Sequence, residues 1–328
     1  MDATVRTVLE EAFPDRSVDR ITATGGSWNG ANETVAVDDG TRAFCKVSRG
    51  DAGRIARERA VLRYVSETRP IAVPPVLAAD ADAADPYLVT APVPGRRLDG
   101  IWPDDDARSN LACAESLFRR VGRTLATLHG ERFESAGEIR GLASAADLDL
   151  DPAPWPDVLH ATVERTREIG TCERLADHYD AVHDCIEANR GRLAGAPAAL
   201  LHGDVAGPNL FVTEPGTDEG GPDGIAAIDW ELAHVGDPAR DLVRATDQLC
   251  NGFDGEGPDR LESALYEGYR ARADGLPRGF ERRRPVYRVV RVLGRSGFLD
   301  QWATHLDTSV EALADRADAE LRARLDAV

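Results

Sequence analysis

The stretch that decides the fold reads HGDVAGPNLFV at residues 202–212, followed by GIAAIDW at residues 224–230. Asp204 and Asn209 lie five residues apart on a turn rich in glycine and proline. Two short apolar runs, separated by a Gly/Asp/Pro-rich turn, predict a hairpin that returns Asp229 to the side of Asn209. An amide oxygen and a carboxylate then converge, and hard oxygen ligands of this kind suit a magnesium ion.

Taken singly, each of these residues has a structural interpretation. An aspartate in a glycine-rich turn is usually a turn residue, and one after a strand often caps a helix. The spacing of Asp204 and Asn209 equals that of a kinase catalytic loop, where the Asp accepts the proton of the attacking hydroxyl and the Asn binds Mg²⁺. Their joint order and spacing, with a lysine in a β-rich region upstream, favour a functional interpretation.

Composition limits the class of protein. A chain of 328 residues exceeds the size at which one core stops growing, so two lobes are expected. The net charge of −18 argues against nucleic acid or anionic membrane as a partner. There is no apolar run of about 18 residues, and the acidic N-terminus lacks signal-peptide features. We therefore expect a soluble cytoplasmic protein, and composition leaves its oligomeric state open.

The acid excess and the near-absence of lysine resemble halophilic adaptation to a salt-rich cytoplasm. An acidic pocket for a cationic substrate is the alternative, but the acids are spread along the whole chain. The five scattered cysteines form no CxxC pair, which indicates neither a disulfide framework nor a zinc site.

Lys46 is the only lysine among 39 basic side chains. Lysine is a slender point charge, whereas arginine is a planar fork suited to bidentate contacts. The single lysine at position 46 is therefore either there by chance or at a position where a guanidinium does not fit.

The first 91 residues begin with a short amphipathic helix at 2–13 and are then rich in β-prone runs. The helix at 51–67 has apolar residues at helical spacing, and Asp51 offers an N-cap. Asp39-Gly40 predicts a hairpin turn. The predicted strands lie in the runs 21–24, 33–37, 42–47, 73–79 and 86–90.

From about residue 110 the pattern is mainly helical. Helices are predicted at 109–130 and at 158–193, the latter as one long helix or a pair. Another starts near Asp237, which precedes a proline at the first helical position. The stretch 131–156 is expected to be an ordered insertion or loop. The arrangement is α+β, with an N-terminal lobe at residues 1–91 and a C-terminal lobe at 92–328.

HGDVAGPN, followed by IDWE and GDPARDL, resembles the aminoglycoside phosphotransferase and choline kinase group of small-molecule kinases. YLVTAPVPGRRL resembles the hinge of that family, and VGRTLATLHG resembles the helix that opens its large lobe. The resemblance covers most of residues 20–250. It implies a two-lobed, protein-kinase-like fold, with a small antiparallel sheet and one helix in the N-lobe and a mainly helical C-lobe.

Carried over residue by residue, the resemblance makes Asp204 the catalytic base. It makes Asn209 and Asp229 the ligands of Mg²⁺, and His202 a support of the loop.

Three further acids in this region have two possible roles each. Asp237 and Asp241 brace the loop from the following helix, with an N-cap and a surface carboxylate as equal alternatives. Glu231 either reaches the metal or faces solvent.

The resemblance also assigns a nucleotide site to the N-lobe. Lys46 contacts the α and β phosphates of ATP and pairs with Glu58, twelve residues later on the next helix. A glycine-rich loop lets backbone N–H groups approach phosphate, and the hinge binds adenine through its backbone. The loop residues are Gly25, Gly26 and Ser27, and the hinge residues are Thr90, Ala91 and Val93.

The resulting hypothesis is an ATP- and Mg²⁺-dependent phosphotransferase that acts on a hydroxyl, and less readily an amine, of a small molecule such as an aminoglycoside, amino alcohol or sugar derivative. A catalytically weak nucleotide-binding regulatory protein and a protein kinase are the alternatives. The second is disfavoured because HGD replaces HRD and no DFG or APE segment occurs. Walker A, GxSxG and HExxH motifs are absent, and His178 and His183 are five apart, which is wrong for one helical face.

Overall fold

The computed structural model describes residues 3–23, 32–37, 42–48, 51–101, 107–170, 172–216, 220–251 and 256–328. The chain divides into two compact units, each formed by three segments of sequence. Unit 1 contains Met1–Trp102, Ile139–Asp151 and Gly207–Ala233. Unit 2 contains Pro103–Glu138, Pro152–Ala206 and His234–Val328.

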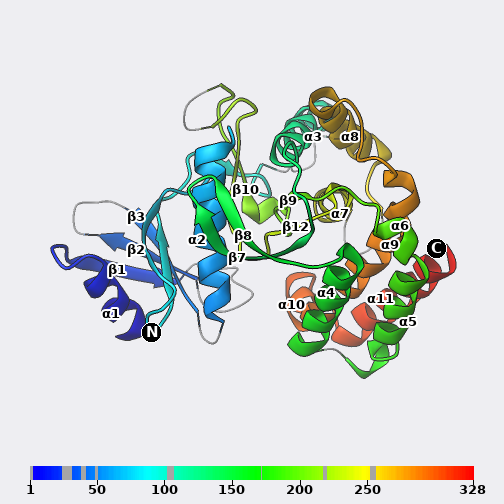
Figure 1. Ribbon diagram of the computed structural model, residues 1–328, viewed down its shortest axis with the longest axis horizontal. Helices are drawn as coiled ribbons and strands as arrows, with labels where there is room; N and C mark the ends of the chain where they lie inside the picture. Colours follow the sequence, from blue (N-terminus) through cyan, green and yellow to red (C-terminus); the bar gives the residue numbers. More distant parts are fainter. Residues whose placement is uncertain are drawn as a thin grey trace. The chain divides into compact units, whose positions relative to one another are not determined.

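Unit 1 is built on a five-stranded antiparallel sheet with the strand order β1-β2-β3-β5-β4 (Figure 1). In the central strand β3, Ala43, Cys45 and Val47 are buried on one face. Lys46 therefore points to the other face, because successive side chains alternate along a strand. The strands are β1 (Val18–Ala23), β2 (Asn32–Val37), β3 (Arg42–Val47), β4 (Val76–Asp80) and β5 (Tyr87–Thr90).

Two helices cover the two faces of this sheet. Helix α1 (Ala3–Ala12) packs Val5, Val8 and Leu9 into a cluster with the buried side chains of β3 and β5. Helix α2 (Ala52–Thr68) covers the face that carries Lys46. The N-terminal strands and helix expected from the sequence are therefore present.

Later segments complete unit 1. Strands β6 (Arg96–Arg97), β10 (Leu210–Val212) and β11 (Ile225–Ala227) form a three-stranded sheet in the order β11-β10-β6. Residues 131–156, expected as an insertion or loop, instead contain strands β7 (Gly137–Ser144) and β8 (Asp147–Pro152), which pair with each other. Glycine and charged residues in β7 give an irregular burial pattern, so the period-2 signal of a strand is weak.

Unit 2 is mainly helical, and strands β9 (Ala199–Leu201) and β12 (His234–Gly236) pair antiparallel within it. Helices α3 and α8 pack side by side (Figure 1). Gly122 and Gly268 lie at this contact, where an added Cβ would collide with the facing backbone. The helices are α3 (Ala107–Leu128), α4 (Trp155–Ile169), α5 (His178–Ala188), α6 (Arg190–Leu193), α7 (Pro238–Ala245), the π-helix η3 (Thr246–Cys250), α8 (Asp259–Ala273), α9 (Phe280–Leu293), α10 (Leu299–His305) and α11 (Val310–Asp326).

Two helix starts test the capping predictions. Asp237 caps α7, since its side chain accepts a hydrogen bond from the Ala239 amide at 3.1 Å. Asp51 occupies the N-cap position of α2, but its side chain makes no capping bond within the described chain and lies 3.3 Å from Nε of Arg54. The predicted N-cap position at Asp51 is therefore confirmed, although its carboxylate pairs with Arg54 in place of a capping bond. The region 158–193, predicted as one long helix or a pair, contains three α-helices, because α4 ends at Ile169 and α5 ends at Ala188 before α6 begins at Arg190.

Across the residues that the structure describes, no helix has both the length and the apolar character needed to cross a bilayer.

Candidate active site

Lys46 lies among carboxylates in unit 1. Its Nζ donates to Glu58, at 3.0 Å from Oε1 and 2.7 Å from Oε2, and it also donates to Oδ1 of Asp229. Oε2 of Glu231 is 3.9 Å away. Strand β3, helix α2 and the turn after β11 therefore bring one cation and three acids together.

This environment fixes the charge of Lys46. Burial disfavours the ammonium, but the carboxylates of Glu58, Asp229 and Glu231 outweigh burial and raise its pKa. Burial also raises the pKa of Glu58, and the ammonium opposes that change. Lys46 is consequently a permanent cation in this site.

The turn after β11 places Asp229 by an uncommon backbone conformation. Asp229 has φ 65°, in the left-handed region that Asp tolerates better than most residues. Buried Trp230 anchors the turn, because its amide donates to Oε1 of Glu58 at 3.3 Å and its indole N–H donates to the Ala227 carbonyl at 3.0 Å.

The hairpin predicted from the sequence brings Asn209 and Asp229 close in the chain's fold. Strands β10 and β11 pair antiparallel, with Leu210 opposite Ala227. The Ile228 amide then donates to the Asn209 carbonyl at 2.9 Å. Asp229 follows immediately, so the two predicted metal ligands lie on adjoining strand ends.

Glu231 joins this group of acids. Glu58, Asp229 and Glu231 each offer a carboxylate oxygen, and these oxygens lie within 4.8 Å of one another. Arg57 donates to the Glu231 backbone carbonyl at 3.0 Å, and Arg54 lies 3.5 Å from its carboxylate. The donor set is all oxygen and partly buried, which fits Mg²⁺.

Asp204 lies in unit 2 and is held by a cation that the sequence did not reveal. Its Oδ1 accepts from Arg244, at 2.6 Å from Nη2 and 3.2 Å from Nε, and from Gln248 at 3.3 Å. Burial would raise the pKa of Asp204, but Arg244, His202 and Arg291 together lower it below its ordinary value. Asp204 is thus kept as a carboxylate.

The sequence signal that could have identified Arg244 and Gln248 as partners of Asp204 is their spacing. Arg244 and Gln248 follow Asp241 by three and seven residues, so they share one face of a helix. That face contacts the loop that carries Asp204, and this contact cannot be deduced from the helix alone.

Asp241 holds the backbone of the loop before Asp204. Its carboxylate accepts from the His202 amide at 2.7 Å and from the Gly203 amide at 3.1 Å, and Nε2 of His129 is 3.4 Å away. Asp241 is 1% exposed, so the surface-carboxylate alternative is wrong. Nδ1 of His202 in turn accepts from the Asp204 amide at 3.2 Å.

Asp237 has a different set of partners. Besides capping α7, it accepts from Arg283, at 2.5 Å from Nε and 3.1 Å from Nη2, and from the hydroxyl of Tyr287 at 2.5 Å. Asp237 is fully buried. Its contacts join the start of α7 to α9, in agreement with the N-cap alternative.

The remaining nucleotide-site predictions are placed only in part. Thr90 ends β5, and the Ala91 amide donates to the Pro75 carbonyl at 2.9 Å. Val93 follows in a half-buried position. The loop residues Gly25, Gly26 and Ser27 lie outside the described residues.

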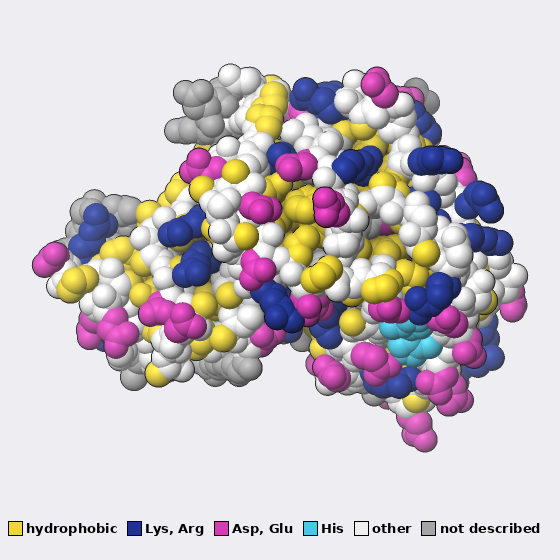
Figure 2. Space-filling view, in the orientation of Figure 1, with side chains coloured by type: hydrophobic (Ala, Val, Ile, Leu, Met, Phe, Trp, Pro, Cys, Tyr) yellow, Lys and Arg dark blue, Asp and Glu magenta, His cyan; other side chains and the backbone are white. Residues whose placement is uncertain are grey.

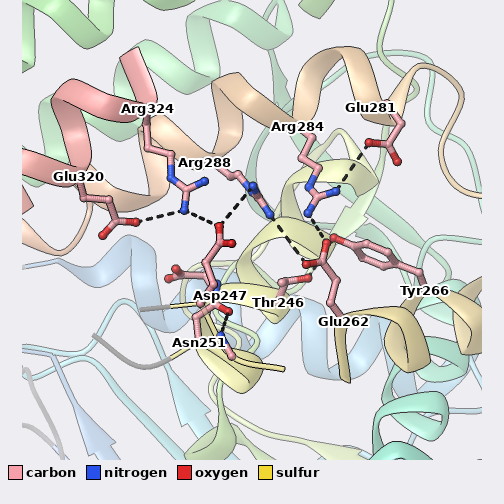
Figure 3. Close-up of polar contacts among 12 residues, drawn as sticks. Thr246, Asp247, Asn251, Glu262, Tyr266, Glu281, Arg284, Arg288, Glu320 and Arg324 are labelled. Carbon is pink, nitrogen blue, oxygen red and sulfur yellow. Dashed lines mark hydrogen bonds and ion pairs between the residues drawn. The ribbon is translucent and has the colours of Figure 1, made fainter. Parts of the chain in front are cut away.

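Unit 2 also contains a group of arginines around a small cavity between η3, α8, α9 and α11 (Figure 3). Each has a carboxylate partner. Arg284 bonds to Glu262, and Arg291 lies 2.7 Å from Asp247. Arg288 lies 3.7 Å from Glu256, and Arg324 bonds to Glu256 at 2.9 Å. Because the charges are matched, this group is a structural ion-pair network rather than an anion site.

The site combines three features. A lysine on a central strand pairs with a glutamate on the next helix, an acid follows a hairpin, and an aspartate lies on a braced loop. These are the parts of a protein-kinase-like fold. The model of the phosphotransferase enzyme family matches residues 23–286, and the chain belongs to that family.

Individual relatives agree with this membership. Viomycin phosphotransferase of Streptomyces vinaceus is 29% identical over 164 residues, and the match spans about half of each protein, 48% of this chain and 48% of the relative. A putative fructosamine-3-kinase structure from Thermobifida fusca YX-ER1 has a TM-score of 0.58 at 22% identity, over 97% of this chain and 99% of the other. The GDP and kanamycin complex of an APH(2") enzyme has a TM-score of 0.62 at 14% identity, over 98% of each chain. These structural likenesses show the two-lobed, protein-kinase-like α+β fold.

Proposed function

We propose that this protein transfers the γ-phosphoryl group of ATP to a hydroxyl of a small molecule, with Mg²⁺ as cofactor. The observation that carries the proposal is the convergence of Lys46, Glu58 and Asp229 from three separate segments of unit 1. Membership of the phosphotransferase family supports the reaction type. In this proposal residues 1–91 are the nucleotide-binding lobe and residues 92–328 the catalytic and acceptor-binding lobe.

Lys46 and its acids prepare the phosphate site. Glu58 fixes the direction of the ammonium through two contacts, so Lys46 is already positioned to bind phosphate oxygens. Asp229, Asn209 and Glu231 would hold the metal, whose positive charge neutralises the phosphate charge during transfer. Asp229 now bonds to Lys46 and would exchange this bond for the metal.

Asp204 is the proposed base. It accepts the proton of the acceptor hydroxyl and orients the oxygen for attack on phosphorus. Arg244 keeps the carboxylate ionised, and Asp241 fixes the backbone that presents it. Catalysis on this scheme is mainly positioning and charge stabilisation.

The hinge would recognise the base of the nucleotide through its backbone. The Ala91 amide is already bonded to Pro75, and Pro92 has no N–H. The Val93 amide is therefore the donor expected to face the purine.

The test is a product assay at high salt, in keeping with the proposed salt-rich cytoplasm. Purified protein, ATP or GTP and Mg²⁺ are incubated with hydroxyl acceptors, including viomycin, aminoglycosides and fructosamines. Phosphorylated products are detected by ³¹P NMR and mass spectrometry. We expect one acceptor class to be phosphorylated.

Asp204→Asn is the matched variant, because it preserves shape and removes the base. We expect it to retain nucleotide binding, measured by calorimetry, while transfer falls roughly 10²–10⁴-fold, the range of general-base contributions. Transfer at the wild-type rate would refute the role of Asp204. Tight nucleotide binding without transfer to any acceptor would instead favour a regulatory protein.

A further inference from the structure

Two histidines from neighbouring helices meet at the surface of unit 2, outside the proposed active site. His160 lies on α4 and His183 on α5, and their Nδ1 atoms are 2.6 Å apart. The ring planes differ by 17°, and the centroids are 4.9 Å apart. The nitrogen separation is shorter than the spacing of stacked rings, so the rings meet edge to edge with the Nδ1 atoms facing each other. Figure 2 shows histidine side chains on this face, over α4 and α5, with acidic side chains beside them.

The outer nitrogens of both rings face carboxylates. Nε2 of His183 is 2.5 Å from Oε1 of Glu164, and Nε2 of His160 is 3.4 Å from Oε2 of Glu187. Carboxylate oxygens accept hydrogen bonds, so these contacts favour the tautomer in which each Nε2 carries the hydrogen. Arg190 donates to Glu187 at 2.7 Å and lowers the pKa of that carboxyl, which keeps it ionised.

This tautomer leaves a lone pair on each Nδ1, because a neutral imidazole carries only one N–H. Two lone pairs that face each other at 2.6 Å repel, so in this tautomer a cation between them would stabilise the arrangement. A proton or a metal ion can fill this position, and Zn²⁺ titration distinguishes the two.

We propose that His160 and His183 form a binding site for a borderline divalent transition-metal ion of the Zn²⁺, Co²⁺ or Ni²⁺ class. Imidazole nitrogen suits these ions. A metal-bound histidine almost always donates its other N–H to a carboxylate or similar acceptor, which is the role that Glu164 and Glu187 have here.

The site is accessible and needs only a small rearrangement. The His160 and His183 side chains are 25% and 22% exposed, so an ion can enter and water can complete its coordination. For a tetrahedral ion at 2.0–2.1 Å from each nitrogen, the Nδ1 atoms must separate to about 3.3 Å. The bound ion would link α4 to α5.

The test is Zn²⁺ binding by calorimetry to tag-free protein in excess Mg²⁺, which occupies the carboxylate group around Lys46. We expect His160→Gln/His183→Gln to lower Zn²⁺ affinity at least tenfold. Glu164→Gln/Glu187→Gln should lower it by roughly 10–100-fold, the usual effect of losing such supporting partners.

The matched control is Asp180→Asn on α5, whose exposed carboxylate pairs with Arg167; it should leave Zn²⁺ affinity unchanged. Circular dichroism checks that each variant is folded, and phosphotransfer should persist in the double histidine variant. In ¹H–¹⁵N spectra of the imidazoles, Zn²⁺ should shift the Nδ1 signals of His160 and His183. Equal Zn²⁺ affinity in the wild type and the double histidine variant would overturn the proposal, as would unmoved Nδ1 signals, which indicate a shared proton only.

Discussion

Asp241→Asn is the perturbation that tests most directly how the loop before Asp204 is held. In the wild-type protein the two carboxylate oxygens accept from two consecutive backbone amides, those of His202 and Gly203. Asparagine offers one acceptor oxygen, so its NH₂ group would face one of these N–H groups. Gly203 has φ 80°, in the left-handed region that favours glycine.

The expected loss follows from these contacts. One buried donor left without an acceptor costs about 1–3 kcal/mol, and turning a charge-assisted bond into a neutral one costs about 1 kcal/mol more. We therefore expect the free energy of unfolding to fall by about 2–4 kcal/mol, measured by urea denaturation. We also expect kcat to fall roughly a hundredfold, since a displacement of about 1 Å at a catalytic group has that effect.

The pH dependence gives a second measurement on the same variant. Burial would raise the pKa of Asp241, but the hydrogen bond from His129 and the nearby histidines lower it overall. A carboxyl with a lowered folded-state pKa stabilises the protein above its unfolded pKa of about 3.9, and this stabilisation is lost as the pH falls. The stability difference between wild type and Asp241→Asn should therefore shrink below about pH 4.

Asp318→Asn is the matched control. Asp318, on α11, is also a largely buried carboxylate of unit 2. It accepts hydrogen bonds from His178 at 2.7 Å and from Arg322 at 3.0 Å. This variant should lose stability while kcat is retained. If Asp241→Asn kept the wild-type kcat and lost less than about 1 kcal/mol, the bracing role of Asp241 would be wrong.

Two further predictions concern the charges of the site. Lys46→Arg should keep the fold, as judged by circular dichroism. It should lower kcat/KM for ATP about 10–100-fold, because losing a charge-assisted contact costs about 1.5–3 kcal/mol. Unchanged kinetics would mean that the single lysine is a matter of chance. Arg244→Gln should raise the pKa of Asp204 and move the acidic limb of the kcat/KM profile to higher pH, since the base must be deprotonated. Gln248→Ala, which removes no charge, should move that limb less, and equal shifts would contradict the electrostatic role of Arg244.

Local patterns predicted the parts of the fold that depend on short-range chemistry. The turn between two apolar runs was enough to place Asn209 beside Asp229, because a hairpin fixes its own register. Strand alternation and helical spacing likewise located β3 and α2. The meeting of Lys46 and Glu58 came from the family resemblance, since spacing alone does not state how a helix lies on a sheet.

Contacts between elements that are distant in the sequence could not be predicted from it. Arg244 reaches Asp204 only because α7 packs beside the loop, and nothing in either segment states that packing. His160 and His183 are separated by 23 residues on two helices. His178 and His183, five residues apart, do not share one helical face, whereas His183 meets His160 across two helices.

The solitary lysine gives this protein an unusual chemical property. Lys46 carries the only ε-amine of the chain, so a lysine-directed acylating reagent has a single side-chain target, inside the proposed phosphate site. Its carboxylate partners keep that amine protonated and poorly nucleophilic. Acylation of that one peptide would thus require the amine to lose these partners and its proton, and no other lysine would contribute a competing background.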